Sequence, residues 1–434
     1  MVCGEVKIDF MEQFTLKNGL RVLFAPAKGT ETVTATVLVR VGSRYEYKKV
    51  NGASHFVEHL LFKGTKRRPT AQHISRALDA IGADFNAFTD KHVTGYYTKV
   101  DNTHLALALD ILSDMLFHST FDAKELARER TVVIEEINMY KDNPSSHVEE
   151  LLEDALFLGS TLGWNIAGSQ KTMTEMPRTE ILEYYKTYYR PGNMVLVVAG
   201  NIDAQARALV EKYFGNKTKQ SDHTSPFVPF ATKSSKEKSP LVRLQTKKTE
   251  QVQLAIGFPS YGIDDDKNTA LSLLSIILGG NMSSRLFVQV REKRGLAYTV
   301  RASNQAYDDV GAFVVRAGLD KKRLALAVAT ILKELRALVK SGVTQTELDD
   351  AKTFVRGQLS IRMEDSASRA QWFATEEMFE KKIHTPQEYL DLIDKVTVLD
   401  VKAIAKELID FEKMCIAVIG PYKDRADFLK KAGL

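Results

Sequence analysis

Runs of apolar residues bounded by turn residues recur in both halves of the chain. Residues 192–201 read Gly-Asn-Met-Val-Leu-Val-Val-Ala-Gly-Asn, and residues 413–421 read Lys-Met-Cys-Ile-Ala-Val-Ile-Gly-Pro. A short continuous apolar run that ends at glycine with asparagine or proline is typical of a buried strand followed by a turn. We therefore expect each half of the chain to close with a buried strand.

Two further pairs of segments occur in the same order in the two halves. Residues 95–100 and residues 311–316 both begin with glycine and show the alternation of a half-buried strand. Residues 121–126 and residues 343–348 both have the composition of a helix start. This repeated order of elements indicates that the chain contains a duplicated domain.

The helix start in the second half carries the two residues of a capping box. Thr344 is a candidate N-cap, and Glu347 follows it by three residues. Strands and helices in this mixture predict the α+β class. We expect two tandem homologous domains, each an antiparallel sheet with helices packed on one face.

The clearest linker candidate divides the chain nearly in half. Residues 216–239 are rich in Lys, Ser, Thr and Pro, a composition that resists regular structure. A chain of 434 residues is too long for one ordinary domain and suits two of about 200 residues each. The predicted organisation is a domain at 1–217, a linker at 218–240 and a second domain at 241–434.

Composition narrows the class of protein. The formal net charge of +5 is small for this length, so without a binding motif it gives no reason to expect nucleic acid. The two cysteines, Cys3 and Cys415, are too few for a disulfide scaffold and are expected to be reduced thiols. No stretch approaches the roughly 20 apolar residues of a membrane helix, and no signal peptide is visible. We expect a cytoplasmic protein, unless a presequence was removed before residue 1.

A candidate metal-binding helix lies at residues 55–62, which read His-Phe-Val-Glu-His-Leu-Leu-Phe. His55 and His59 are four residues apart, so on a helix both imidazoles lie on one face and can bind one metal ion. Glu58 would lie beside that ion, where it can accept a proton from a bound water without being a ligand. His-x-x-Glu-His is the inverted form of the zincin motif. The competing interpretation is a pair of hydrogen-bonded core histidines, so a third ligand is needed.

An acidic segment at residues 125–137 has the composition of a second helix. Glu129 and Glu136 lie two turns apart and share a face. Val132 and Val133 lie between them, so we expect both acids on a buried side. Buried carboxylates need partners, which a metal ion and its surroundings supply. The alternative interpretation is a solvated acidic face, so the value of this helix depends on its pairing with the histidine helix.

Together the two helices resemble the pitrilysin/insulinase family of zinc metallopeptidases, which includes the mitochondrial processing peptidases. In that family a His-x-x-Glu-His helix is completed by a distant glutamate, the second of two acids separated by six residues. Here Glu136 follows His59 by 77 residues, and Glu129 occupies the place of the earlier acid. The resemblance implies that Glu136 is the third zinc ligand, with Glu135 as the alternative. It also implies that Glu129 orients a ligand or assists catalysis.

The resemblance extends over essentially the whole chain. The residues before and after the histidine helix, 52–54 and 62–65, are also similar to the family. The chain is most similar to the two-domain bacterial members and to the beta subunit of mitochondrial processing peptidase. This implies a cofactor, Zn²⁺, and a substrate that is a peptide or an unfolded polypeptide segment.

Two further sets of residues are implied to bind substrate. Residues 82–89 are expected to form an edge strand, and in the family the matching strand receives the substrate backbone by strand addition. That role falls on Asn86, Ala87 and Phe88. In the second half, Arg291 and Tyr298 match an Arg and a Tyr seven residues apart, whereas Arg294 does not match. The resemblance implies that this pair binds the substrate backbone and stabilises the oxyanion.

The second half lacks the metal motif. Aligning the halves through Gly95 and Gly311 places Leu271, Leu274 and Ser275 where the first half has its two histidines and glutamate. We therefore expect one zinc ion per chain, with the first domain catalytic and the second contributing to substrate binding.

These residues predict a zinc-dependent endopeptidase in which Glu58 is the general base for a zinc-bound water that attacks the peptide carbonyl. Two-repeat members of the family need a second chain to enclose a chamber, so we expect a homodimer, with a heterodimer with a related chain as the alternative. Two other hypotheses are a non-catalytic interaction subunit, which would typically have lost its ligands, and a metalloenzyme that acts on something other than peptides.

Overall fold

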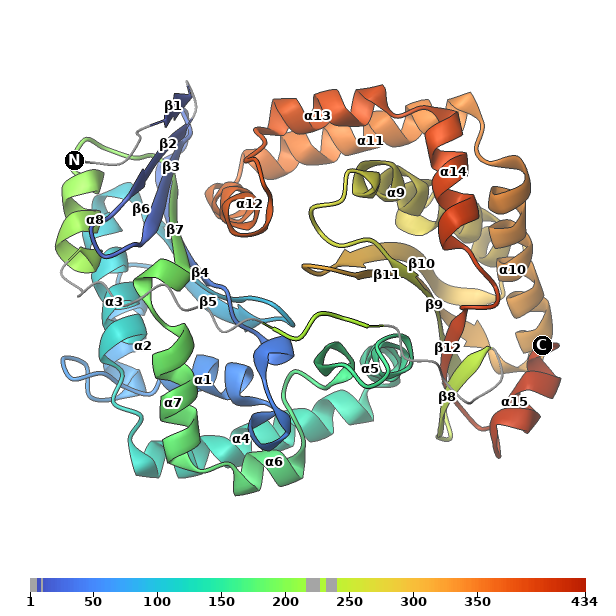
Figure 1. The fold of residues 1–434 in the computed structure, drawn as a ribbon, viewed down its shortest axis with the longest axis horizontal. Coiled ribbons are helices and arrows are strands. Elements are labelled where there is room, and N and C mark those ends of the chain that lie inside the picture. Colours follow the sequence, from blue (N-terminus) through green and yellow to red (C-terminus); the bar gives the residue numbers. More distant parts are fainter. Residues whose placement is uncertain (1–5, 9–10, 216–226, 232–239) are drawn as a thin grey trace. The chain divides into compact units, whose positions relative to one another are not determined.

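The computed structural model describes residues 6–8, 11–215, 227–231 and 240–434 (Figure 1). Most of the predicted linker at 218–240, and Cys3, lie outside these residues. The chain forms two compact units, and each takes segments from both halves of the sequence. The first comprises Met1–Ile137, Asn165–Val228 and Leu359–Ile383, and the second comprises Asn138–Trp164, Pro229–Gln358 and His384–Leu434.

The first unit is built on a seven-stranded sheet. Its strands are β1 (Val6–Ile8), β2 (Met11–Thr15), β3 (Arg21–Pro26), β4 (Thr32–Val39), β5 (Asp84–Thr89), β6 (Thr94–Asp101) and β7 (Met194–Gly200). They lie in the order β1-β2-β3-β7-β4-β6-β5, antiparallel except for the parallel pair β3 and β7. Strand β5 lies at one edge, which confirms the edge strand predicted at residues 82–89.

Helices cover one face of this sheet. They are α1 (Ala53–Leu61), α2 (Ala71–Asp79), α3 (Leu105–His118), α4 (Ala123–Asp142), α6 (Gln170–Glu175), α7 (Arg178–Tyr188) and α8 (Ala206–Phe214). Strand β4 shows how the sequence sets this packing, because successive side chains point to opposite faces. Val33 and Val37 lie in the core beneath the helices, whereas Thr34 points to the other face.

A helix from the second half of the sequence packs on that other face. This helix, α12 (Ser366–Phe379), lies across β4 and β7 (Figure 1). Its Ala370, Phe373 and Ala374 are fully buried against the sheet. Thr34 and Ser366 share a hydrogen bond of 2.8 Å between their hydroxyl oxygens. The first unit therefore has helices on both faces of its sheet.

The second unit repeats this plan. Its strands are β8 (Leu241–Thr246), β9 (Gln251–Ser260), β10 (Ala297–Ala306), β11 (Gly311–Asp320) and β12 (Cys415–Gly420). They lie in the order β10-β11-β9-β12-β8, and β8 and β12 are the parallel pair. Read from β8, this is the order β3-β7-β4-β6-β5 of the first unit. Strand β10 is thus the counterpart of the edge strand β5.

The helices of the second unit are also divided between two faces. One face carries α9 (Lys267–Ser275), α10 (Leu324–Ser341), α11 (Gln345–Met363), α13 (Pro386–Lys395), α14 (Val398–Leu408) and α15 (Arg425–Ala432). The other face carries α5 (Pro144–Leu156), which comes from the first half of the sequence and packs on β9 and β12 (Figure 1). The two halves of the sequence thus each give one helix to the sheet of the other half.

The structure confirms the α+β class and the two homologous domains, but each sheet also carries one helix on its second face, where the sequence predicts helices on one face alone. The two closing strands are β7 and β12, and every residue of both is buried. The capping box is also confirmed, because Thr344 Oγ1 accepts a hydrogen bond from the backbone N–H of Glu347, and Glu347 accepts one from that of Thr344. Cys415 is a free, buried thiol. Among the described residues, every helix is too short or too polar to cross a membrane.

Candidate metal centre

Helix α1 is fixed at its start by a buried carboxylate. Glu46 accepts hydrogen bonds of 2.8 Å from the backbone N–H groups of Gly52 and Ser54, and one of 2.9 Å from the side chain of Asn51. These bonds satisfy N–H groups that the first turn of a helix leaves without partners. Gly52 has a φ of 98°, and a Cβ there would lie 2.6 Å from the carbonyl oxygen of Ala167. The chain can therefore enter the helix at this angle only with glycine.

The apolar side chains of α1 lie in the core, whereas its two histidines and its glutamate do not. Val57, Leu60 and Leu61 are buried. His55, Glu58 and His59 are each partly exposed. The pattern of the sequence thus determines which face of the helix is available to a ligand.

His55 and His59 lie beside Glu136 of α4, as predicted. The Nε2 atoms of the two histidines are 3.2 Å apart. Glu136 Oε2 lies 3.6 Å from Nε2 of His55 and 3.4 Å from Nε2 of His59. Within the described part of the chain, these three residues are the one group of three whose ligand atoms all lie within 4.8 Å of one another. Glu135, the alternative ligand, is exposed and is not part of the group.

This triangle of atoms has the size that a zinc site requires. Ligand atoms that bind a tetrahedral zinc ion at about 2.0–2.1 Å are separated by roughly 3.3 Å from one another. The three observed separations are 3.2, 3.4 and 3.6 Å. Two imidazole nitrogens and one carboxylate oxygen also form a usual donor set for catalytic zinc, which keeps its fourth position for water. The residues present therefore fit the ion.

Glu129 lies behind the triangle. Its Oε1 is 2.8 Å from Nδ1 of His59, and its Oε2 is 2.7 Å from Nζ of Lys63. A histidine that donates Nδ1–H to a carboxylate leaves the lone pair of Nε2 for a metal ion. Burial alone would raise the pKa of Glu129. Because the hydrogen bonds from His59 and Lys63 outweigh burial, the pKa of Glu129 is lowered. Glu129 is thus placed to orient His59.

One expectation for α4 is wrong. Glu129 and Val133 are buried, but Val132 is 48% exposed. The buried stripe of the helix runs through Leu126, Glu129, Val133 and Ile137, and Val132 lies beyond one margin of it. Glu136 lies near the same margin and is partly exposed, which leaves it accessible to an ion from solvent.

Glu58 occupies the place beside the triangle. Its Oε2 accepts a hydrogen bond of 2.5 Å from Thr89 Oγ1, the last residue of β5. Burial raises the pKa of Glu58, although the bond from Thr89 opposes this effect. A carboxylate that is close to the ligands and has a raised pKa can accept a proton and return it.

The two imidazoles differ in their proton affinity. Burial and the neighbouring ring of His59 lower the pKa of His55 to about 4. Burial also opposes protonation of His59, but its bonds to Glu129 and Glu136 raise its pKa to about 9. Two positive rings with Nε2 atoms 3.2 Å apart would repel each other, so one ring stays neutral.

The predicted substrate strand lies next to these residues. Asn86, Ala87 and Phe88 are in β5, which pairs with β6 and whose other side is the free edge of the sheet. Ala87 packs against the core on the helical face, and Phe88 packs on the face that carries α12. Because Thr89 bonds to Glu58, the end of this edge strand is tied to the site.

Arg291 and Tyr298 lie together in the second unit. Arg291 lies in a π-helical turn (Phe287–Glu292), and Tyr298 is the second residue of β10. Arg291 Nη1 donates a hydrogen bond of 2.7 Å to the carbonyl oxygen of Tyr298 and packs over its ring. The side chain of Tyr298 is 69% exposed, so this pair is accessible from solvent.

Sequence reasoning overlooked three residues that contact the site. The sequence predicts Thr89 only as the end of the edge strand, and Lys63 only as part of the segment after the motif. Glu46 precedes α1 by seven residues, a spacing that no capping rule covers, so the sequence has no signal for its role. For Lys63, the spacing of four residues from His59 was a usable signal, because such residues share a helix face.

Comparison with known proteins finds zinc proteases among the relatives of this chain. The family model described as insulinase (peptidase family M16) matches residues 21–170, and the model described as the peptidase M16 inactive domain matches residues 175–355. An uncharacterized zinc protease of Bacillus subtilis is 35% identical over 412 residues, covering 95% of this chain and 98% of its own. A similar protein of Streptomyces coelicolor, also described as an uncharacterized zinc protease, is 34% identical and covers 98% of this chain and 93% of its own.

Solved structures share the fold. A protease from Helicobacter pylori superposes with a TM-score of 0.88 at 23% identity, covering 97% of this chain and all of that one. A peptidase M16 inactive domain from Pseudomonas fluorescens superposes with a TM-score of 0.87 at 20% identity, covering 95% of this chain and 98% of that one. At these identities the likeness concerns the fold.

Proposed function

The chain belongs to the insulinase family of peptidases, family M16, and we propose that it is a zinc-dependent endopeptidase that hydrolyses peptides or unfolded polypeptide segments. The observation that carries the proposal is the triangle of His55, His59 and Glu136, which has the dimensions of a zinc site and has Glu58 beside it. We assign the three as zinc ligands and one zinc ion to each chain. The second unit supports this number, because it has Leu271, Leu274 and Ser275 in the matching places.

The protein's own groups perform the proton transfers in this proposal. A bound zinc ion supplies Lewis acidity and lowers the pKa of water in its open position. Glu58 accepts a proton from the attacking water and returns it to the leaving amine. Thr89 supports this role, because its hydrogen bond holds one carboxylate oxygen of Glu58, and the other accepts no hydrogen bond from the described residues. Glu129 assists by orienting His59.

Substrate binding is assigned to the edge strand and to the second unit. A peptide that adds to the free edge of β5 would be bound through its backbone by Asn86, Ala87 and Phe88. Such binding gives affinity without a strict sequence preference. Arg291 and Tyr298 are assigned to the substrate backbone and to the developing oxyanion, a role supported by their mutual contact and by the exposure of Tyr298.

The assembly and location belong to the same proposal. We propose a homodimer that encloses the site in a chamber, with a heterodimer with a related chain as the alternative. Because one chain carries both the candidate ligands and the Arg291–Tyr298 pair, two identical chains would supply every assigned residue. The proposed cytoplasmic location rests on the small number of cysteines. Measurement of the molecular mass in solution tests the proposed dimer.

Exchange of Glu58 tests the proposed function. Glu58→Gln should bind one zinc per chain as the unaltered protein does, but cleave a fluorogenic peptide with a kcat/KM about 10²- to 10⁴-fold lower, because the amide cannot accept the proton. Zinc content by mass spectrometry and cleavage with and without chelator are measured on the same samples. Retained cleavage in this variant would overturn the assignment of the base.

Two matched variants on α4 test the third ligand. Glu136→Gln should lose zinc and activity, whereas Glu135→Gln, which removes the neighbouring exposed carboxylate, should retain both. Zinc without peptide cleavage in the unaltered protein would favour a metalloenzyme with another substrate. Neither zinc nor cleavage would favour a non-catalytic interaction protein.

A further inference from the structure

Lys63 forms the outer end of a chain of polar contacts that leads to His59. Lys63 lies four residues after His59, just beyond the end of α1. Its Nζ is 2.7 Å from Oε2 of Glu129, and Oε1 of the same carboxylate is 2.8 Å from Nδ1 of His59. The side chain of Glu129 is only 5% exposed. Each oxygen of a buried carboxylate is thus engaged by a different partner, one a cation and one an imidazole.

The backbone next to Lys63 is tied to the start of the helix that carries Glu129. The carbonyl oxygen of Gly64 accepts hydrogen bonds from the backbone N–H and the hydroxyl of Thr120, at 3.1 and 3.2 Å. Thr120 precedes α4 by three residues. Gly64 has a φ of 133°, and a Cβ at this position would lie 2.5 Å from the carbonyl oxygen of Pro69. This tight turn fixes the path of the backbone directly after Lys63.

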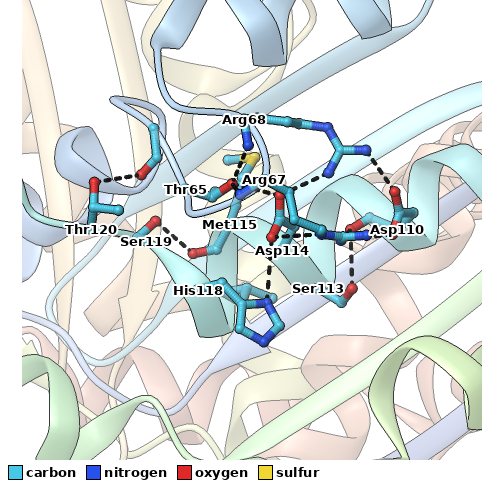
Figure 2. Close-up of polar contacts among 12 residues, drawn as sticks. Thr65, Arg67, Arg68, Asp110, Ser113, Asp114, Met115, His118, Ser119 and Thr120 are labelled. Carbon is cyan, nitrogen blue, oxygen red and sulfur yellow. Dashed lines mark hydrogen bonds and ion pairs between the residues drawn. The ribbon is translucent and has the colours of Figure 1, made fainter.

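A buried carboxylate holds the residues that follow. Figure 2 shows Asp114 of α3 among Thr65, Arg67 and Arg68. Asp114 is fully buried and accepts hydrogen bonds of 2.6 Å from Thr65 Oγ1 and 2.8 Å from Arg68 Nη1. Arg67 Nε donates to its other oxygen at 3.2 Å. The segment after α1 is therefore anchored to α3, and the Lys63–Glu129 contact lies between two fixed parts of the backbone.

These contacts distinguish Lys63 from an ordinary surface lysine. An exposed ion pair contributes little, because solvent screens it and the side chains must lose freedom. Here the acid is buried and both backbones are anchored, so the carboxylate has little freedom to rotate. The orientation of the ligand pair depends on this support, because Nδ1 of His55 is buried without a hydrogen-bond partner in the described part of the chain.

We propose that Lys63 is a positioning residue of the metal site. By holding Oε2 of Glu129, it keeps Oε1 directed at Nδ1 of His59, and His59 then presents the lone pair of Nε2 to the ion. The inference rests on the proposed zinc site and extends it by one residue. Mutation of the hydrogen-bond partner of a metal ligand usually lowers metal affinity by about 10- to 100-fold. Mutation of a residue that acts through such a partner should lower it by about 10-fold.

Zinc affinity of the purified full chain tests this inference. The dissociation constant is measured by competition with a chromophoric chelator, a readout that does not depend on cleavage. Lys63→Met should weaken zinc binding about 10-fold. Lys63→Arg should keep zinc affinity within about 2-fold of that of the unaltered protein, because its guanidinium can bind the same oxygen of Glu129. Lys66→Met is the matched control, since Lys66 lies three residues away with an exposed side chain, and it should bind zinc normally.

A double variant separates positioning from a general loss of stability. If Lys63 acts through Glu129, then adding Lys63→Met to Glu129→Gln should change zinc affinity by less than about 2-fold. A full 10-fold loss in that background, or normal affinity of Lys63→Met alone, would overturn the role of Lys63 while the zinc site itself stands. Failure of the unaltered chain to bind zinc would overturn the proposed function, and this inference with it.

Discussion

Helix α1 of the first unit and helix α9 of the second unit hold equivalent places in two sheets of the same topology. Each helix follows the matching strand, β4 or β9, and each packs beside the edge strand of its sheet, β5 or β10. In α1 the three positions of the motif are partly exposed and carry His55, Glu58 and His59. In α9 the same positions carry buried side chains, namely the core residues Leu271 and Leu274 and the buried Ser275.

The difference extends beyond the motif. By the same alignment, Glu46 corresponds to Gly262 and Lys63 to Gly279. A Cβ on Gly279 would lie 2.3 Å from the backbone nitrogen of Ala302. In the second unit, strand β10 therefore occupies the space that a side chain at this position would need. A metal site on this scaffold thus needs an open helix face, a capping carboxylate and supporting residues. In the second unit, packed core residues occupy the space that such a site would need.

The largest expected effect comes from transferring the motif to α9. The triple variant Leu271→His, Leu274→Glu, Ser275→His places polar and charged groups where Leu271 and Leu274 are fully buried. Burial of an unpaired charge and loss of two core leucines should cost more than about 5 kcal/mol, enough to unfold the unit. Circular dichroism with urea titration measures this loss.

The reciprocal variant on α1 is the control for that experiment. His55→Leu, Glu58→Leu, His59→Ser gives α1 the residues of α9 at positions that are partly exposed. This chain should fold and lose zinc. If the α9 variant instead folded normally and bound a second zinc ion, the interpretation of α9 as a packed helix would be wrong.

A smaller effect concerns the carboxylate that caps α1. Burial raises the pKa of Glu46 to about 7 from an ordinary value of 4.5, despite bonds from Ser54 and Gly52 that oppose the shift. Between these values the folded state binds a proton that the unfolded state has released. The free energy of unfolding should therefore fall as pH rises through this window, by about 3 kcal/mol in total, and level off above it.

Glu46→Gln isolates this contribution, because the amide keeps the shape and does not titrate. The difference in unfolding free energy between the variant and the unaltered protein is measured by urea titration at pH 5, 6, 7 and 8. It should move in favour of the variant as pH rises. A constant difference across this range would show that Glu46 does not titrate there. The second unit, with Gly262 at this position, offers no such group.

Local periodicity was sufficient to predict much of the fold. The two closing strands, the edge strand β5 and the capping box at Thr344 depend on neighbours in the sequence, and the structure has all of them. The repeat of elements also predicted two homologous domains. Periodicity does not show on which sheet a helix packs. Helices α5 and α12 each join the sheet of the other half, a choice made by contacts between residues far apart in the sequence.

The candidate site divides in the same way. His55 and His59 are paired by helical spacing, so the sequence could predict that they lie together. Glu136 could be selected over Glu135 only by family resemblance, and in the structure Glu136 is the acid that lies beside the two histidines. Residues that support the site from elsewhere, such as Glu46, carry no spacing signal, because a buried carboxylate from a preceding loop can approach a helix start from many chain paths.

We propose that one zinc ion is held by His55, His59 and Glu136. This ligand set can be tested by anomalous diffraction at the zinc absorption edge, with crystals of the unaltered chain prepared with zinc. We expect one peak per chain, in contact with Nε2 of each histidine and a carboxylate oxygen of Glu136, and none near α9. A chain with no peak among these three residues, or with its peak at another set of ligands, would show that they do not form the zinc site.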